Sequence, residues 1–136
     1  MVAPDTFLRR CESRLLLVPL IERAGVRIQQ PIWAHDDSEP EPDVALVPLG
    51  DYSARHPDRA FLVIEVADSS LAFDRETKAP LYAASNVAEY WVVDLVGRAI
   101  EVHTEPKAGR FTQVRRVDSG PVAPPASQQL PVPQLP

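Results

Sequence analysis

The chain has 136 residues, and its 45% hydrophobic and 24% charged residues fit one globular domain and exclude a disordered chain. The formal net charge of -5 and the sequence pI of about 5.1 argue against a protein that grips nucleic acid through a broad basic face. They do not exclude a nuclease, because a bound metal ion returns positive charge to an acidic site.

The first predicted element is a helix over residues 6–24, where apolar side chains recur at helical spacing and Gly25 follows as a C-terminal cap. Pro19 should kink this helix or end it early. Its apolar run is too short to cross a bilayer and has no cleavage site after it, so we expect a core helix and not a signal peptide. The single cysteine, Cys11, excludes an internal disulfide, and we expect a cytoplasmic protein.

Apolar runs and turn signals predict the remaining elements in chain order: strands at 26–32, 44–47 and 61–67, a helix at 74–85, and strands at 90–94, 99–103 and 111–117. The run 61–67 is apolar on both faces, which is typical of a central strand. Asp74 is expected to cap the second helix, and Pro80 to shorten it. The order predicts an α/β fold, a mixed sheet flanked by helices.

The C-terminal end differs from the rest in composition. From Ser119 onward the chain holds six of its fifteen prolines and no charged residue. Such a segment favours an extended or flexible tail. We therefore expect one domain over residues 1–118 and a proline-rich tail over 119–136.

Two carboxylates in this pattern suggest chemistry. Glu65 lies in the apolar run 61–67, where a charge is costly unless it is paired or bound to a metal; alternatively it lies at a strand end, in solvent or bonded to a backbone amide. Asp43 opens a strand after Glu39 and Glu41, which share its side of an extended segment, and alone it could be an ordinary turn acid. If the two strands are antiparallel neighbours, Asp43 and Glu65 meet, and their repulsion calls for a cation, Mg²⁺ first and Mn²⁺ second.

Lys78 follows on the predicted helix, with Tyr82 one turn further along. A lysine beside two carboxylates and a metal could stabilise charge on a phosphoryl group. The alternative is a solvated surface lysine that pairs with Asp74, four residues earlier. Other candidates are weaker: we interpret 35–37 as a solvated loop and Asp94 as a turn acid, and find no obvious partners for the two remaining histidines, His56 and His103.

Five stretches resemble the Uma-two family of "putative restriction endonucleases", over residues 10–117. They are EPEPDVALV (39–47), LVIEVADSS (62–70), DRETK (74–78), LY (81–82) and EYWVVD (89–94). The resemblance implies a PD-(D/E)xK nuclease-type fold, with Asp43 as the Pro-Asp acid and Glu65 as the strand acid. The superfamily's lysine would fall at Ala67, and the family's lysine matches Lys78 on the next helix. Glu41 and Tyr82 fall on recurring positions as accessory residues.

The expected function is Mg²⁺-dependent hydrolysis of phosphodiester bonds in DNA. Asp43 and Glu65 would hold the metal, and Lys78 would stabilise developing negative charge. The alternative is a catalytically inactive nuclease-like fold that serves as a binding or assembly module. A homodimer is expected, because one small acidic domain offers little surface to a duplex.

Overall fold

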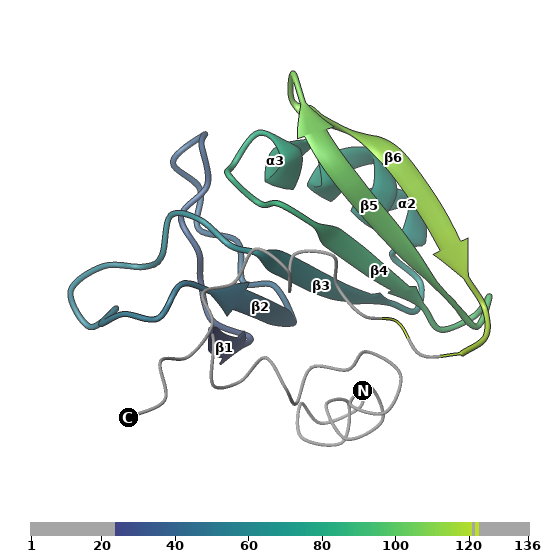
Figure 1. Cartoon of the computed structure of the whole chain (residues 1–136), viewed down its shortest axis with the longest axis horizontal. Coiled ribbons are helices and arrows are strands. Elements are labelled where there is room, and N and C mark those ends of the chain that lie inside the picture. Colours follow the sequence, from purple (N-terminus) through teal and green to yellow (C-terminus); the bar gives the residue numbers. More distant parts are fainter. Residues whose placement is uncertain (1–23, 121, 123–136) are drawn as a thin grey trace, which may run out of the picture.

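The computed structural model describes residues 24–120 and residue 122. The helix predicted at 6–24 lies outside these residues except for Ala24, and so does most of the predicted tail. Six strands form one sheet: β1 (Gly25–Ile28), β2 (Val44–Val47), β3 (Leu62–Ala67), β4 (Tyr90–Asp94), β5 (Ala99–Lys107) and β6 (Arg110–Val117). One helical segment runs through α2 (Leu71–Phe73), the wider π-helical turn η2 (Asp74–Lys78) and α3 (Ala79–Ala83) (Figure 1).

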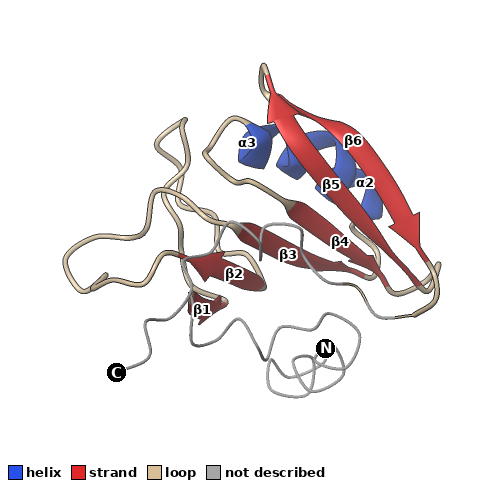
Figure 2. Cartoon of the chain, in the orientation of Figure 1, coloured by secondary structure: helices blue, strands red, loops and turns tan. Residues whose placement is uncertain are grey.

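The strands lie in the sheet in the same order as in the chain. Every neighbouring pair is antiparallel except β3 and β4, which are parallel. A parallel pair needs a crossover, and the helical segment supplies it. Figure 2 shows this segment lying against one face of the sheet. The predicted α/β fold with a mixed sheet is therefore confirmed, with β3 in a central position.

Each face of the sheet has its own core. The face toward the helical segment buries residues that include Val63, Tyr82 and Tyr90. The opposite face buries a second cluster that includes Ile64 and Trp91. The alternation of a strand therefore sends Glu65 to the same side as Val63, beneath the helical segment.

The sequence predicted the strands well and the helix less well. The first strand ends at Ile28 instead of 32, because Gln29 takes a positive φ of 50° that leaves the extended region. The helical segment begins at Leu71, so Asp74 lies inside it and its predicted capping role is wrong; Ser70 occupies the N-cap position. Pro80 lies in the first turn of α3, where its missing N–H is tolerated after the wide turn.

One residue of the predicted tail packs onto the sheet. Val122 is buried in the cluster on the face opposite the helical segment. The chain therefore still contributes to the core four residues beyond the expected boundary at 118, and the boundary itself stays a prediction. Within the described residues, no helix has the length and apolar character needed to cross a membrane.

Candidate active site

The antiparallel pairing of β2 and β3 brings Asp43 and Glu65 together. Val44 lies opposite Ile64, so Asp43 and Glu65 form the next pair beyond the ladder. The Asp43 N–H donates to Glu65 Oε1 at 2.9 Å, and the Val66 N–H donates to Asp43 Oδ2 at 2.8 Å. Each carboxylate is thus held by a backbone amide of the neighbouring strand. The predicted juxtaposition is present, and so is the backbone bond foreseen in the alternative for Glu65.

Lys78 completes the group from the helical segment. Its Nζ donates a hydrogen bond to Glu65 Oε2 and lies 3.6 Å from Asp74 Oδ1. The Tyr82 hydroxyl, one turn further on, donates to the same Glu65 oxygen at 3.4 Å. Only 30% of the Lys78 side chain is exposed, so the alternative of a solvated surface lysine is wrong, although its expected pairing with Asp74 is present.

Burial controls the protonation of this group. Glu65 is only 3% exposed, and burial raises the pKa of its carboxyl in spite of the hydrogen bond from Lys78. Burial lowers the pKa of Lys78 less than its bonds and its nearby carboxylates raise it, so the net pKa is raised and the side chain stays an ammonium. Burial also raises the pKa of Tyr82 far above its usual range, which keeps its hydroxyl a donor to Glu65.

Asp74 belongs to this site, whereas the sequence suggested it only as a helix cap or as the partner of a surface Lys78. Its carboxylate accepts a hydrogen bond from the Ser70 hydroxyl at 2.9 Å and faces Lys78. The Tyr90 hydroxyl donates to the Asp74 backbone carbonyl at 3.2 Å, which fixes the helical turn to the sheet. The available signal was the spacing of four between Asp74 and Lys78, which puts both on one helix face. That spacing could not show that this face looks toward the sheet.

The two carboxylates of Asp43 and Glu65 could supply part of the ligand shell of a Mg²⁺ ion. Asp43 and Glu65 offer two adjacent carboxylates, and Mg²⁺ commonly takes one or two carboxylates and completes its octahedron with water. Among the described residues, no group of three or more His, Cys, Asp or Glu side chains is placed to hold an ion. The two residues therefore fit a water-rich Mg²⁺ site and do not fit a closed cage of protein ligands.

A second ionic group lies on the same face of the sheet. Glu65, Val92, Glu101 and Arg116 form one row across β3 to β6. Arg75 and Arg116 both donate to the buried Glu101, and the bond from Arg75 lowers the pKa of that carboxyl. This group was missed because its members come from three elements, with Arg75 on the helical segment, Glu101 on β5 and Arg116 on β6.

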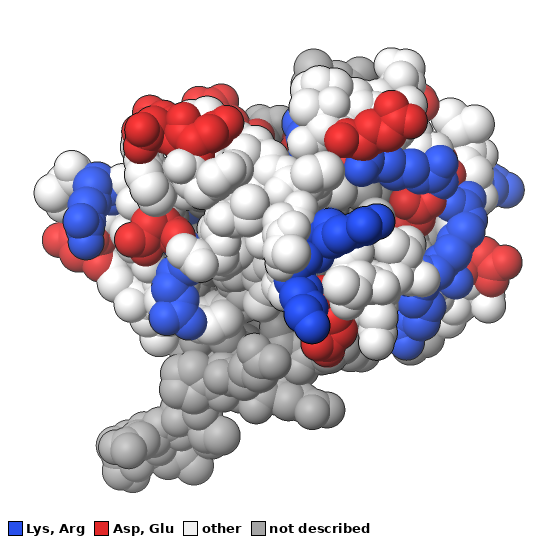
Figure 3. All heavy atoms as spheres, turned by 90° about the horizontal axis from the view of Figure 1, so that it is seen from above, with Lys and Arg blue, Asp and Glu red and all other residues white. Residues whose placement is uncertain are grey.

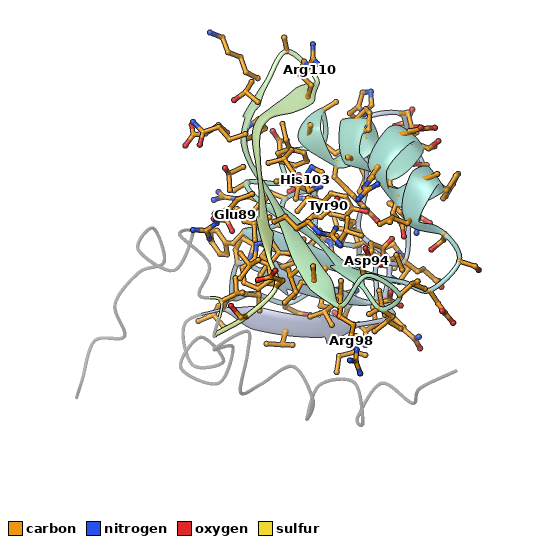
Figure 4. The ribbon with its side chains drawn as sticks, turned by 90° about the vertical axis from the view of Figure 1, so that its right-hand side faces the viewer. Glu89, Tyr90, Asp94, Arg98, His103 and Arg110 are labelled. Atoms are coloured by element: carbon orange, nitrogen blue, oxygen red, sulfur yellow. The ribbon has the colours of Figure 1, made fainter. Side chains whose placement is uncertain are left out.

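Two weaker predictions concern residues near this second group. Asp94 accepts the Gly97 N–H at 2.8 Å, so the turn role is confirmed, and it also pairs with Arg116 at 3.0 Å. The ring of His103 lies beside Glu101, with 3.5 Å between its Nε2 and the Glu101 carboxylate, but that nitrogen has no hydrogen-bond partner among the described residues and burial lowers the pKa of the ring. Tyr90 and His103 lie between the sheet and the helical segment, and Asp94 lies toward the far end of the strands (Figure 4).

The remaining candidates stay outside the site. Glu41 is exposed, and no described residue bonds its side chain, so its accessory role remains a prediction from the resemblance. His35 contacts the Ser85 hydroxyl at 3.2 Å, and Asp36 accepts the Ser38 N–H at 3.0 Å. Residues 35–37 are exposed, as expected of a solvated loop, although the contact with Ser85 ties this loop to the end of the helical segment. His56 Nε2 lies 3.8 Å from Glu39, which is too far for a hydrogen bond and is an ion pair only when the ring is protonated.

The mixed sheet with one helical crossover is an α/β fold, consistent with the restriction-endonuclease-like class. The family model described as "Putative restriction endonuclease" (Uma2) matches residues 6–135, and the chain belongs to this family. A solved structure similar in fold is a "putative nuclease belonging to DUF820" from Anabaena variabilis, with 13% identity and a TM-score of 0.63, over 95% of this chain and 74% of that one. No curated protein matches the sequence.

Proposed function

We propose that this protein is a Mg²⁺-dependent endonuclease that hydrolyses phosphodiester bonds in DNA. The observation that carries the proposal is the Lys78 ammonium, held against Glu65 at the point where Glu65 meets Asp43. Two carboxylates alone could serve a structural purpose. A cation aimed into the same spot from another element adds a group suited to a negatively charged transition state.

Each residue has a defined task in this proposal. Asp43 and Glu65 would hold the ion, and the backbone amides that bond them keep the two carboxylates in register. When bound, Mg²⁺ supplies Lewis acidity toward the phosphate and lowers the pKa of the attacking water. The Lys78 ammonium would turn from Glu65 toward the negative charge that develops on the phosphoryl oxygens. The protonated Tyr82 hydroxyl would hold the Glu65 carboxylate in orientation.

The charge distribution is consistent with a local grip on DNA. Figure 3 shows acidic and basic side chains mixed over that face of the molecule, with the basic ones more numerous in one half and acidic ones interspersed among them. Together with the net charge of -5, this favours few phosphate contacts per chain. A homodimer would double that contact area, and we propose one, in a reducing cytoplasm suited to the single cysteine.

A second function is favoured by a specific observation. Both oxygens of Glu65 already accept hydrogen bonds from protein donors, namely the Asp43 amide, Lys78 and Tyr82. A carboxylate satisfied in this way does not require a metal. The alternative is therefore a catalytically inactive nuclease-like fold that acts as a binding or assembly module.

Nicking of supercoiled plasmid separates the two functions. Purified protein should nick the plasmid with Mg²⁺ or Mn²⁺ and not with EDTA, and Lys78→Met should abolish nicking. The same samples should still gain thermal stability from the ion, because a ligand that binds only the native state raises the melting temperature. Lys107→Met, at an exposed position, is the matched control. Equal nicking by the Lys78 variant would overturn the assigned role, and no nicking by any sample would favour the alternative.

A further inference from the structure

A hollow of about 460 Å³, whose lining includes none of Asp43, Glu65 and Lys78, lies between the two loops that flank β2. Both loops extend from the sheet on the side away from β5 and β6 (Figure 1). The Trp33 N–H donates to the Pro57 carbonyl at 2.8 Å and joins the loops. The lining residues are Trp33, Glu39, Tyr52, Ser53, Ala54, Arg55, His56 and Asp58.

The walls of this hollow are aromatic and partly fixed. Trp33 is 40% exposed, whereas Trp91 is fully buried in the core. The Tyr52 hydroxyl donates to the Pro48 carbonyl at 2.6 Å, and Arg27 lies 5.5 Å from the centre of its ring. An exposed tryptophan beside an anchored tyrosine offers flat surfaces on which a flat ligand can stack.

The polar groups of the hollow favour a neutral ligand. Glu39 and Asp58 place two carboxylates on the lining against one guanidinium, that of Arg55, so a phosphate is disfavoured. Carboxylates accept hydrogen bonds from the amino groups of nucleobases. His56, which also lines the hollow, has a buried Nδ1 with no hydrogen-bond partner among the described residues.

The hollow lies close to the candidate active site along the chain. Glu39 lines it, and Asp43 follows four residues later. Four residues span at most about 14 Å even when fully extended. At the rise of about 3.4 Å per nucleotide of a stacked strand, this upper limit corresponds to at most about four nucleotides.

We propose that this hollow binds an unpaired nucleobase of single-stranded DNA, a few nucleotides from the bond that is cut. The inference rests on the proposed function for its biological meaning. It narrows the substrate class to single strands or duplexes with an unpaired segment, because a base inside an intact stack cannot reach the hollow.

Binding can be measured without cutting. A fluorescently labelled, mixed-sequence DNA strand of eight nucleotides is titrated with the full chain in EDTA and followed by anisotropy. Two competitors are used, an abasic strand of the same length and charge and a duplex of the same sequence. The base-containing strand should bind at least about tenfold more tightly than either, because stacking on aromatic side chains contributes strongly to single-strand affinity. In parallel, the bound strand should shield Trp33 from acrylamide quenching, while the buried Trp91 supplies a constant background.

Two variants and one control locate the binding. Trp33→Leu should weaken binding of the single strand by about tenfold or more, and His56→Ala should weaken it to a lesser degree. Val96→Ala, at an exposed apolar residue in the β4–β5 turn, should change nothing. Equal affinity for the abasic strand, or an unchanged Trp33→Leu protein, would overturn the inference. If base-dependent binding is found in EDTA and Mg²⁺ yields no cutting, the proposed function fails while the binding site stands.

Discussion

The Lys78→Met substitution keeps most of the apolar length of the side chain and removes its charge. Glu65 then stays 3% exposed with the Asp43 amide at 2.9 Å and the Tyr82 hydroxyl at 3.4 Å as its donors. Removing one partner of a fully buried ion pair costs about 3–5 kcal/mol. Lys78 is partly exposed, so water can replace some of its contribution and the cost should be smaller.

Protonation of Glu65 sets an upper limit on that cost. Adding a proton at pH 7 to a glutamate whose pKa is the ordinary 4.5 costs about 3.4 kcal/mol, because each pH unit above the pKa adds about 1.36 kcal/mol. A protein that lost Lys78 could always take up this proton, so the cost of the substitution cannot exceed that value. We therefore expect a loss of about 1.5–3 kcal/mol in the free energy of unfolding at pH 7. Because burial raises the folded-state pKa of Glu65 above its ordinary value, a larger fraction of this carboxyl is protonated at pH 4.5 than at pH 7. The loss should therefore be smaller at pH 4.5 than at pH 7.

Urea unfolding followed by circular dichroism at pH 7 and pH 4.5 measures both values. Lys107→Met is the control, because Lys107 is exposed at the end of β5 and its replacement should change stability by less than about 0.5 kcal/mol. A loss of equal size at the two pH values would show that Lys78 stabilises by packing and not through the Glu65 charge. No loss at pH 7 would refute the buried pair.

Three further predictions follow from the same contacts. Glu65→Gln should leave the free energy of unfolding at pH 7 unchanged or higher. The pKa of Glu65 is raised by folding, so the ionised carboxylate lowers stability once the pH rises above that pKa. A decrease of more than about 2 kcal/mol, measured by urea unfolding, would contradict this. Glu101→Gln should lower the free energy of unfolding by about 1–2 kcal/mol at pH 7, because the hydrogen bonds from Arg75 and Arg116 need the ionised carboxylate. This difference should disappear as the pH falls through the lowered pKa of Glu101. An equal difference in acid would exclude that cause. Gly97→Ala should lower the melting temperature measurably, because a Cβ there would overlap the Asp94 carboxylate and the guanidinium that pairs with it; an unchanged temperature would show that the turn can shift.

The sequence predicted the parts of the fold that depend on local pattern. The apolar run around Glu65 indicated a central strand, and the helical crossover between β3 and β4 produces that position. Asp43 and Glu65 could be paired in advance because one antiparallel register joins two strands that follow one another in the chain. The start of the helical segment could not be predicted, since Ser70 and Leu71 carry no stronger signal than Asp74.

The contacts of the helical segment depended on information that the sequence lacks. Lys78 could point to the carboxylates or to solvent, and the packing of Tyr82 and Tyr90 beneath the helix decides between them. To predict the ionic group around Glu101, one would have to know both the register of β5 with β6 and that Arg75 approaches from the helical segment. Such contacts join three separate elements, and no spacing within one element indicates them.

The most direct test of the central claim is a crystal of this protein soaked in Mn²⁺, with anomalous scattering measured at the manganese absorption edge. The account predicts one anomalous peak between the Asp43 and Glu65 carboxylates, with an oxygen of each at about 2.0–2.6 Å from the ion. It also predicts that Lys78 Nζ leaves Glu65 Oε2 while it remains near the site. A peak that avoids both carboxylates, or no peak there at saturating Mn²⁺ with Lys78 still bonded to Glu65, would contradict the account.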